Sequence, residues 1–217
     1  MIDTTITIAG ISIHEPVTVF TDLIISAIAI LFYFKLRNSK TQVIIHWGYF
    51  FLFFGISTFV GSCSHAFFLM HEGWMYKSFW IPMQLINGVA VYFAQQATLV
   101  SVLQNNASKS TWEKIYRFQL IAFMIAVPLF RNFLVTVIEN ALGLIPVMVL
   151  HYKYKEHYAK IIANGIAISF LTAIIHISKF SLHAYFNSND IAHVFIMISL
   201  WVMYKGVNIK RKESIQR

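Results

Sequence analysis

Apolar residues occur along this chain in long runs, and short polar segments separate the runs. A helix needs about 20 mostly apolar residues to cross the roughly 30 Å hydrocarbon layer of a membrane. The pattern therefore predicts an all-α protein, a seven-transmembrane helix bundle that forms a single domain over residues 1–217. The predicted spans are 17–35, 43–70, 79–104, 114–130, 132–152, 159–182 and 190–208.

The boundary between the fourth and fifth spans is the least distinct. Pro128, Arg131 and Asn132 interrupt an otherwise apolar stretch, either as a tight turn or as a kink within one helix. A single span over 114–152 would be too long for a membrane. We therefore expect a turn.

Composition excludes an ordinary water-soluble domain. Hydrophobic residues make up 58% of the chain and charged residues only 12%, whereas charged residues make up about 25% of soluble domains. The single cysteine, Cys63, excludes an intramolecular disulfide and a thiolate metal cluster. The first basic residue is Lys35, so we expect no cleavable signal peptide and assign membrane insertion to the first helix.

The net charge of +8 predicts the orientation of the bundle rather than a nucleic-acid partner. Fourteen of the 17 basic residues fall in the first, third and fifth loops and the C-terminal tail, and only Lys77, Arg131 and Lys179 fall on the other side. Basic residues collect in cytoplasmic loops, so we expect the N-terminus outside and the C-terminus in the cytoplasm. These loops are too short to form a nucleic-acid-binding domain.

Polar and ionisable residues within the spans share one depth. Asp or Lys at a helix centre costs roughly 2.5–3.5 kcal/mol, so those that remain point to function. At 1.5 Å per residue, those of six helices fall within roughly the outer 5–12 Å of the bilayer, which predicts one outward-facing polar cavity. They are Asp22, His65, Gln84, Asn87, Glu139, Asn140, His176, Lys179, His183, Asp190 and His193.

Three of these histidines suit a catalytic zinc site. His65, His183 and His193 would come from separate elements, and three protein ligands leave a fourth position open on a tetrahedral zinc. Asp190, Glu72 and Asp22 are candidates for a nearby carboxylate that orients a ligand or accepts a proton.

Structural roles compete with these assignments. Any one of these histidines could serve as an interhelical hydrogen-bonding residue, and we expect that role for His176. Asp190 follows Asn187-Ser188-Asn189 and could cap the seventh helix.

The arrangement resembles the superfamily of alkaline ceramidases and progestin/adipoQ receptors. The resemblance rests on the seven spans, on Gly61-Ser62-Cys63-Ser64-His65 late in the second helix, and on His193 early in the seventh. It implies a zinc-dependent amide hydrolase site inside the bundle. Residues 185–194 and 204–206 are also similar to an uncharacterised bacterial family of seven-helix membrane proteins, which implies a bacterial inner (plasma) membrane.

The chain departs from that superfamily at three places. Gly61 stands where the Ser-x-x-x-His pattern of the second helix has serine, and Ser62 is the nearest match. Asn189 and Met197 flank His193 where the pattern has a second histidine, so we assign the third ligand to His183. Tyr76 stands where the superfamily has an aspartate.

These observations favour a zinc-dependent integral-membrane hydrolase that acts on a lipid amide or ester from the outer side, with membrane lipid as the substrate. Asp190 and the hydroxyl groups of Ser62 and Ser64 would be its catalytic groups. Two alternatives remain open: a bis-histidine haem electron-transfer protein, and a non-enzymatic receptor or transporter with a ligand-binding outer cavity. The sequence leaves the oligomeric state open.

Overall fold

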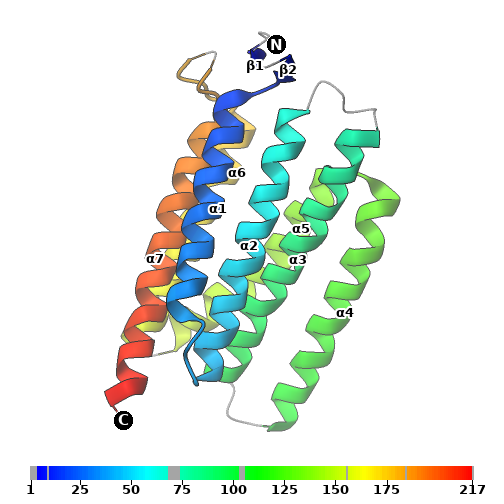
Figure 1. The fold of residues 1–217 in the computed structure, drawn as a ribbon. Coiled ribbons are helices and arrows are strands. Elements are labelled where there is room, and N and C mark those ends of the chain that lie inside the picture. The colour runs from blue at the N-terminus through cyan, green and yellow to red at the C-terminus, as the bar shows by residue number, and fades with distance from the viewer. Residues whose placement is uncertain are drawn as a thin grey trace.

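The computed structural model describes residues 4–8, 10–67, 74–102, 106–154, 156–183 and 185–216. Seven long helices and one short antiparallel hairpin make up these ranges (Figure 1). The elements are β1 (Ile6–Ile8), β2 (Ile11–Ile13), α1 (Pro16–Leu36), α2 (Gln42–Ala66), α3 (Trp74–Val102), α4 (Asn106–Phe130), α5 (Phe133–Lys153), α6 (His157–Ser178) and α7 (Ser188–Gln216).

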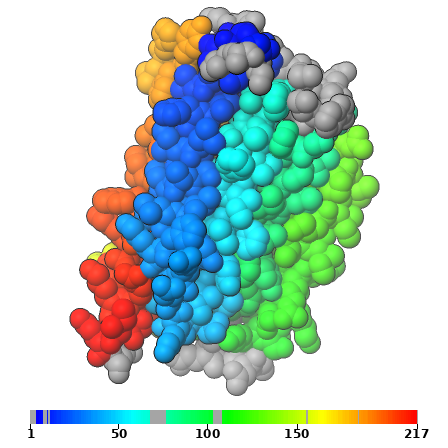
Figure 2. Space-filling model, viewed as in Figure 1, coloured from blue at the N-terminus to red at the C-terminus, as the bar shows by residue number. Residues whose placement is uncertain are grey.

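Six of these helices form a closed ring. α1 packs against α2 and α7, α2 against α3, α3 against α5, α5 against α6, and α6 against α7. In the space-filling view α1 lies between α7 and α2 (Figure 2). The core is apolar, with Trp47, Phe51 and Ile162 fully buried, whereas many large apolar side chains lie exposed. An apolar exterior around an apolar core is typical of a bundle in lipid.

α4 lies outside the ring, packed on α3 and α5 (Figure 1). Six described helices are long and apolar enough to cross a membrane, and α4 does not reach that standard. Glu113, Lys114 and Arg117 occupy its first half. Its apolar part, 118–130, would reach only about 20 Å at 1.5 Å per residue. The predicted fourth span, 114–130, is therefore the one whose length and polarity do not meet the requirement for a membrane crossing.

α4 nevertheless runs alongside the other helices for much of the height of the bundle (Figure 1). Phe118, Ile121 and Leu129 lie exposed along one of its faces. α4 ends at Phe130 and α5 begins at Phe133, so the expected turn is present. Successive helices run in opposite directions, and the two chain ends lie at opposite ends of the bundle.

The N-terminal hairpin covers the end of the bundle where α1 begins and α2 ends (Figure 1). Ile6 pairs with Ile13, and Gly10 adopts a positive φ of 81° in the turn. The backbone N–H of His14 donates to the carbonyl oxygen of Ala66 at 3.0 Å, which joins the hairpin to α2. The hydropathy pattern did not predict these strands.

Close glycine contacts hold α6 against α7. A methyl group added at Gly206 would lie 2.8 Å from the carbonyl oxygen of Tyr158, and one at Gly165 would lie 2.9 Å from the backbone nitrogen of Met203. Ser199 Oγ donates to the carbonyl oxygen of Gly165 at 2.8 Å. Small residues that let helix backbones approach are a common basis of packing in membranes.

We predict that Gly206→Ala destabilises the bundle by about 1–3 kcal/mol, because the new methyl group meets backbone atoms that cannot move aside. Gly48→Ala is the matched control, since its methyl group would lie 3.7 Å from Leu36 and Tyr33, an ordinary contact. Thermal unfolding in detergent compares the two. Equal midpoints for both variants would contradict the packing described here.

Candidate metal centre

Five ionisable side chains gather where α1, α2 and α7 meet beside the hairpin. Asp22 comes from α1, His65 from α2, and Asp190 and His193 from α7, while Glu15 directly precedes α1. Asp22 is 5% exposed and Asp190 is 0% exposed. Buried carboxyl groups in an apolar bundle require partners, so the geometry of this cluster decides what it can do.

The carboxyl group of Asp22 lies close to two imidazole rings. Its Oδ1 is 3.5 Å from Nε2 of His193, and its Oδ2 is 4.0 Å from Nε2 of His65. The ring centroids of the two histidines are 6.4 Å apart, with an interplanar angle of 79°. Both separations from Asp22 exceed those of good hydrogen bonds. The Nε2 atoms therefore face the carboxyl group without being bonded to it.

The other nitrogen of each ring has a close partner. Nδ1 of His193 lies 2.7 Å from Oγ1 of Thr21. Thr21 uses its single hydroxyl proton to donate to the carbonyl oxygen of Thr18 at 3.0 Å. With its proton used in this way, Thr21 can accept from Nδ1–H of His193, which is the tautomer that a metal at Nε2 requires. This tautomer leaves the lone pair on Nε2, directed at the space beside Asp22.

His65 is oriented in the same way by a carboxylate. Its Nδ1 lies 2.6 Å from Oε2 of Glu15 and donates its proton there. Glu15 itself has a backbone φ of 47°, in the left-handed region. A non-glycine residue in that region costs on the order of 1–3 kcal/mol, and such strain clusters at functional sites. The strained backbone immediately precedes Pro16 and places the Glu15 carboxylate against His65.

Asp22, His65 and His193 offer the donor set of a zinc site. Ligand bonds of about 2.0–2.2 Å in a tetrahedron place neighbouring ligand atoms about 3.4 Å apart. The 3.5 Å separation of Asp22 and His193 matches this value, and the 4.0 Å separation of Asp22 and His65 is somewhat wider. Metal-bound histidines also typically donate their second N–H to a carboxylate or another acceptor, as both rings do here.

Among the described residues, no group of three or more His, Cys, Asp or Glu side chains is close enough as it stands to hold a metal ion. Zinc binding at this cluster would require the His65 side to contract.

Asp190 ties the start of α7 to the rest of the bundle. Its Oδ2 accepts from the backbone N–H of Asn187 at 2.8 Å, while Oδ1 of Asn187 accepts from the N–H of Asn189 at 2.7 Å. This reciprocal pair is a capping box. Oδ1 of Asp190 accepts from Thr18 Oγ1 at 2.8 Å, across to α1. Both carboxyl oxygens are thus engaged, which favours a positioning role.

The two serines of α2 differ in their partners. Ser62 Oγ donates to the carbonyl oxygen of Phe59 at 2.6 Å within its own helix. Ser64 Oγ is buried and has no hydrogen-bond partner among the described residues. Gly61, one turn before His65, lies directly beside the cluster: a methyl group there would be 3.4 Å from Oδ2 of Asp22 and 3.1 Å from Sδ of Met83.

His183 lies apart from the other two histidines. It is exposed in the loop between α6 and α7, where its ring stacks on Tyr185 and its Nδ1 accepts from the Tyr185 N–H at 3.2 Å. The structure therefore does not bring the predicted third ligand into the cluster, and Asp22 takes that place in the geometry. His176 is exposed near the end of α6, and Glu72 falls outside the described residues.

The polar side chains expected to share one depth form two hydrogen-bonded groups among the described residues. Asn87 donates to Asn140 at 2.8 Å, and Thr136 donates to Gln84 at 2.7 Å, so α3 and α5 pair with each other. Glu139 is buried on the same helix as Thr136 and Asn140. Depth alone does not distinguish the two sides of a bundle.

The chain belongs to a family of unknown function, DUF6962, whose match covers residues 17–212. No curated protein and no solved structure matches the chain. The matched region includes Asp22, His65 and His193.

We predict that Thr18→Val lowers the free energy of unfolding by about 1–3 kcal/mol, because it removes a hydrogen bond to the buried Asp190 carboxyl group. Thr98→Val is the control. Thr98 is equally buried, but it donates only to Ala94 within its own helix, at 2.8 Å. Unfolding in detergent should separate the two variants, and similar losses would show that the link between α1 and α7 contributes little.

Proposed function

We propose that this protein is a zinc-dependent integral-membrane hydrolase that acts on the amide or ester bond of a membrane lipid reached from the outer side. The observation that supports the proposal is the convergence of Asp22, His65 and His193, whose Nε2 atoms face one carboxyl group. The resemblance to the alkaline ceramidase and progestin/adipoQ receptor superfamily points to the same chemistry.

Asp22, His65 and His193 would hold the ion. A bound zinc supplies Lewis acidity, which polarises a carbonyl group and lowers the pKa of water. Glu15 and Thr21 fix the tautomer and the direction of the two imidazole rings through their hydrogen bonds to Nδ1. Asp190 holds the start of α7, and with it His193, against α1.

Ser64 is the better of the two candidate serines for stabilising a developing oxyanion, because its hydroxyl group has no described partner. Ser62 would have to give up its bond to Phe59 first. The proposed catalytic roles are thus divided: Ser64 supplies a free donor, and Asp190 acts through the position of α7.

The surroundings of Asp22 favour a lipid substrate. Asp22 is six residues beyond Pro16, or about 9 Å along α1. Its neighbours Phe20 and Leu23 are 63% and 39% exposed. A site at this depth beside lipid-facing side chains suits the amide or ester group of a lipid, which lies just below the head group.

The same geometry disfavours the bis-histidine haem alternative. A haem would have to lie between the two Nε2 atoms that bind its iron, on opposite sides of the ring. The carboxyl group of Asp22 lies within 4.0 Å of both atoms and would crowd a planar ring beside them. The outer cluster therefore suits a compact ion better than a planar cofactor.

We further propose that the N-terminus lies outside and the C-terminus in the cytoplasm of a bacterial inner membrane, with α4 as a short seventh crossing. The partition of basic residues supports this orientation. The alternating directions of the helices are compatible with it.

For the topology, we predict that single cysteines introduced in a Cys63→Ser background react with a membrane-impermeant maleimide only on one side. Arg131→Cys and Ser181→Cys should be labelled in intact cells, whereas Arg37→Cys and Lys109→Cys should react only after lysis. Labelling of Arg131→Cys only after lysis would show that α4 does not cross the membrane.

For the metal, we predict that the purified protein contains about one zinc per chain by elemental analysis. Asp22→Asn, His65→Ala and His193→Ala should each lose most of it, because two ligands hold zinc poorly. His183→Ala is the control and should keep its zinc, since the structure places this residue in the outer loop.

Activity is measured separately from metal content. Proteoliposomes that contain lipid amides and esters should release free fatty acid, detected by mass spectrometry, and a chelator should stop the release. A folded, zinc-free wild-type protein would overturn the metal site. Zinc without release of fatty acid would leave the metal site standing and reject the hydrolase, in favour of a receptor or transporter.

A further inference from the structure

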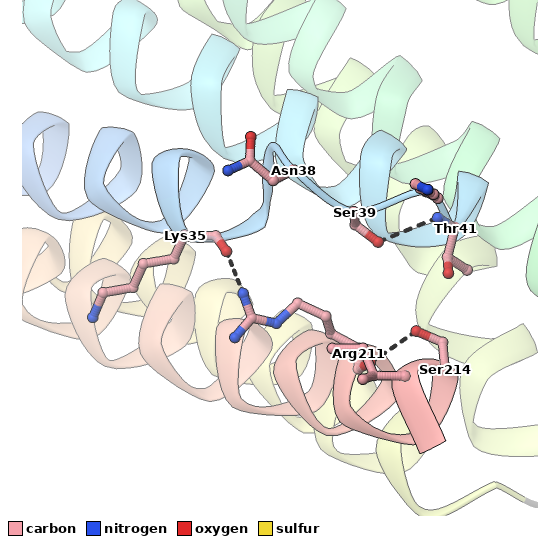
Figure 3. A pocket seen from close by; sticks show the side chains of 8 residues that line it. Lys35, Asn38, Ser39, Thr41, Arg211 and Ser214 are labelled. Carbon is pink, nitrogen blue, oxygen red and sulfur yellow. Dashed lines mark hydrogen bonds between the residues drawn. The ribbon is translucent and has the colours of Figure 1, made fainter. Parts of the chain in front are cut away.

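A pocket lies at the other end of the bundle, between the loop that joins α1 to α2 and the last turns of α7 (Figure 3). Its volume is about 410 Å³. The lining residues are Lys35, Asn38, Ser39, Lys40, Thr41, Arg211, Ser214 and Ile215. Of these described residues three are basic and none is acidic, so the pocket favours an anion.

Arg211 provides the main donor of this pocket. Its Nη1 donates to the backbone carbonyl oxygen of Lys35, and this bond links α7 to the end of α1 (Figure 3). Its Nε is buried and has no hydrogen-bond partner among the described residues. An unsatisfied buried donor costs about 1–3 kcal/mol, more when it is charged. The Nε atom has almost no accessible surface, so a ligand with acceptor oxygens would reach it only after the Arg211 side chain shifts.

The N-terminus of α2 borders the pocket through Thr41. Thr41 is the N-cap residue, and no side chain caps the helix there. The N–H of Thr41 donates to Ser39 Oγ at 3.2 Å, which holds the loop in place (Figure 3). The first N–H groups of a helix attract anions through their free donors and the helix dipole.

Lys40 supplies a second positive charge, whereas Lys35 does not contribute its ammonium group. The side chain of Lys35 extends away from Arg211, and its Nζ lies 5.9 Å from the centre of the Tyr204 ring (Figure 3). Lys35 therefore lines the pocket with its backbone. One guanidinium group, one lysine, three hydroxyl groups and a helix N-terminus together match the oxygens of a phosphate group.

We propose that this pocket binds a phosphate group, carried by an anionic phospholipid or free in solution. Basic pockets between helices at the cytoplasmic side commonly bind lipid head groups. Ile215, which is 76% exposed, gives the pocket an apolar edge beside which an acyl chain could lie. The site is separate from the outer cluster and does not depend on the proposed hydrolase.

The test measures binding to the full-length protein in a neutral detergent by titration, followed by a change in the thermal midpoint. The probes are dioctanoyl phosphatidylglycerol, dioctanoyl phosphatidylcholine and inorganic phosphate. We expect phosphatidylglycerol to bind, with Arg211→Gln weakening it about tenfold or more and Lys40→Gln about threefold. Lys212→Gln is the matched control, because it removes the same charge from an exposed residue that does not line the pocket.

Each outcome of this experiment is decisive. Binding of phosphatidylglycerol without binding of inorganic phosphate identifies a lipid as the source of the phosphate group. If inorganic phosphate also binds, and Arg211→Gln weakens its binding as much as it weakens the binding of phosphatidylglycerol, the ligand is a free phosphoryl group. Equal binding of phosphatidylcholine and phosphatidylglycerol, or equal losses in Lys212→Gln and Arg211→Gln, would overturn the proposal. If Arg211→Gln alone fails to fold, the comparison of Lys40→Gln with Lys212→Gln decides.

Discussion

The end of this bundle where α1 begins is organised by the need to satisfy polar groups that the first two turns of α1 carry into an apolar environment. Thr18 bonds Asp190 of α7, Thr21 bonds His193 of α7, and Asp22 faces both His193 and His65. A charged or polar group is costly in the apolar part of a membrane, so these partners offset the cost of placing such groups there. The contacts that join α1 to α7 thus also orient the imidazole ring of His193.

The ring of six helices explains why the polar groups divide into two sets. α1, α2 and α7 meet on one side of the ring, and α3 and α5 pair on another, with α4 packed outside them. Each set is satisfied locally, through Thr18 and Thr21 on α1 and through the pairs of Asn87 with Asn140 and Gln84 with Thr136. Interhelical hydrogen bonds of this kind contribute modestly to stability but fix which helices are neighbours. The ionisable cluster therefore lies on the side of the ring where α1, α2 and α7 meet, and His176 of α6 is near enough to interact electrostatically with His65 and His193.

Hydropathy predicted the helices and the turn after Phe130, since length and polarity along the chain determine both. It also placed His65 and His193 at one depth. Depth says nothing about position around the ring of helices, so it did not show that Glu139 and Asp22 lie on different sides of the bundle. His183 was assigned by depth too, although the loop between α6 and α7 directs it outward. Glu15 escaped notice because it precedes the first apolar run, and its left-handed backbone is visible only in three dimensions.

Gly61 connects the departure from the resembled superfamily to the role of Asp22. Where that pattern has a serine one turn before the histidine of the second helix, this chain has a glycine, and a methyl group there would meet Oδ2 of Asp22 at 3.4 Å and Met83 at 3.1 Å. A side chain at this position would thus be in ordinary contact with the carboxyl group and tight only against the flexible Met83 side chain. Gly61 leaves room beside His65 for both groups, so the small residue on α2 and the position of the α1 carboxyl group belong to one packing arrangement.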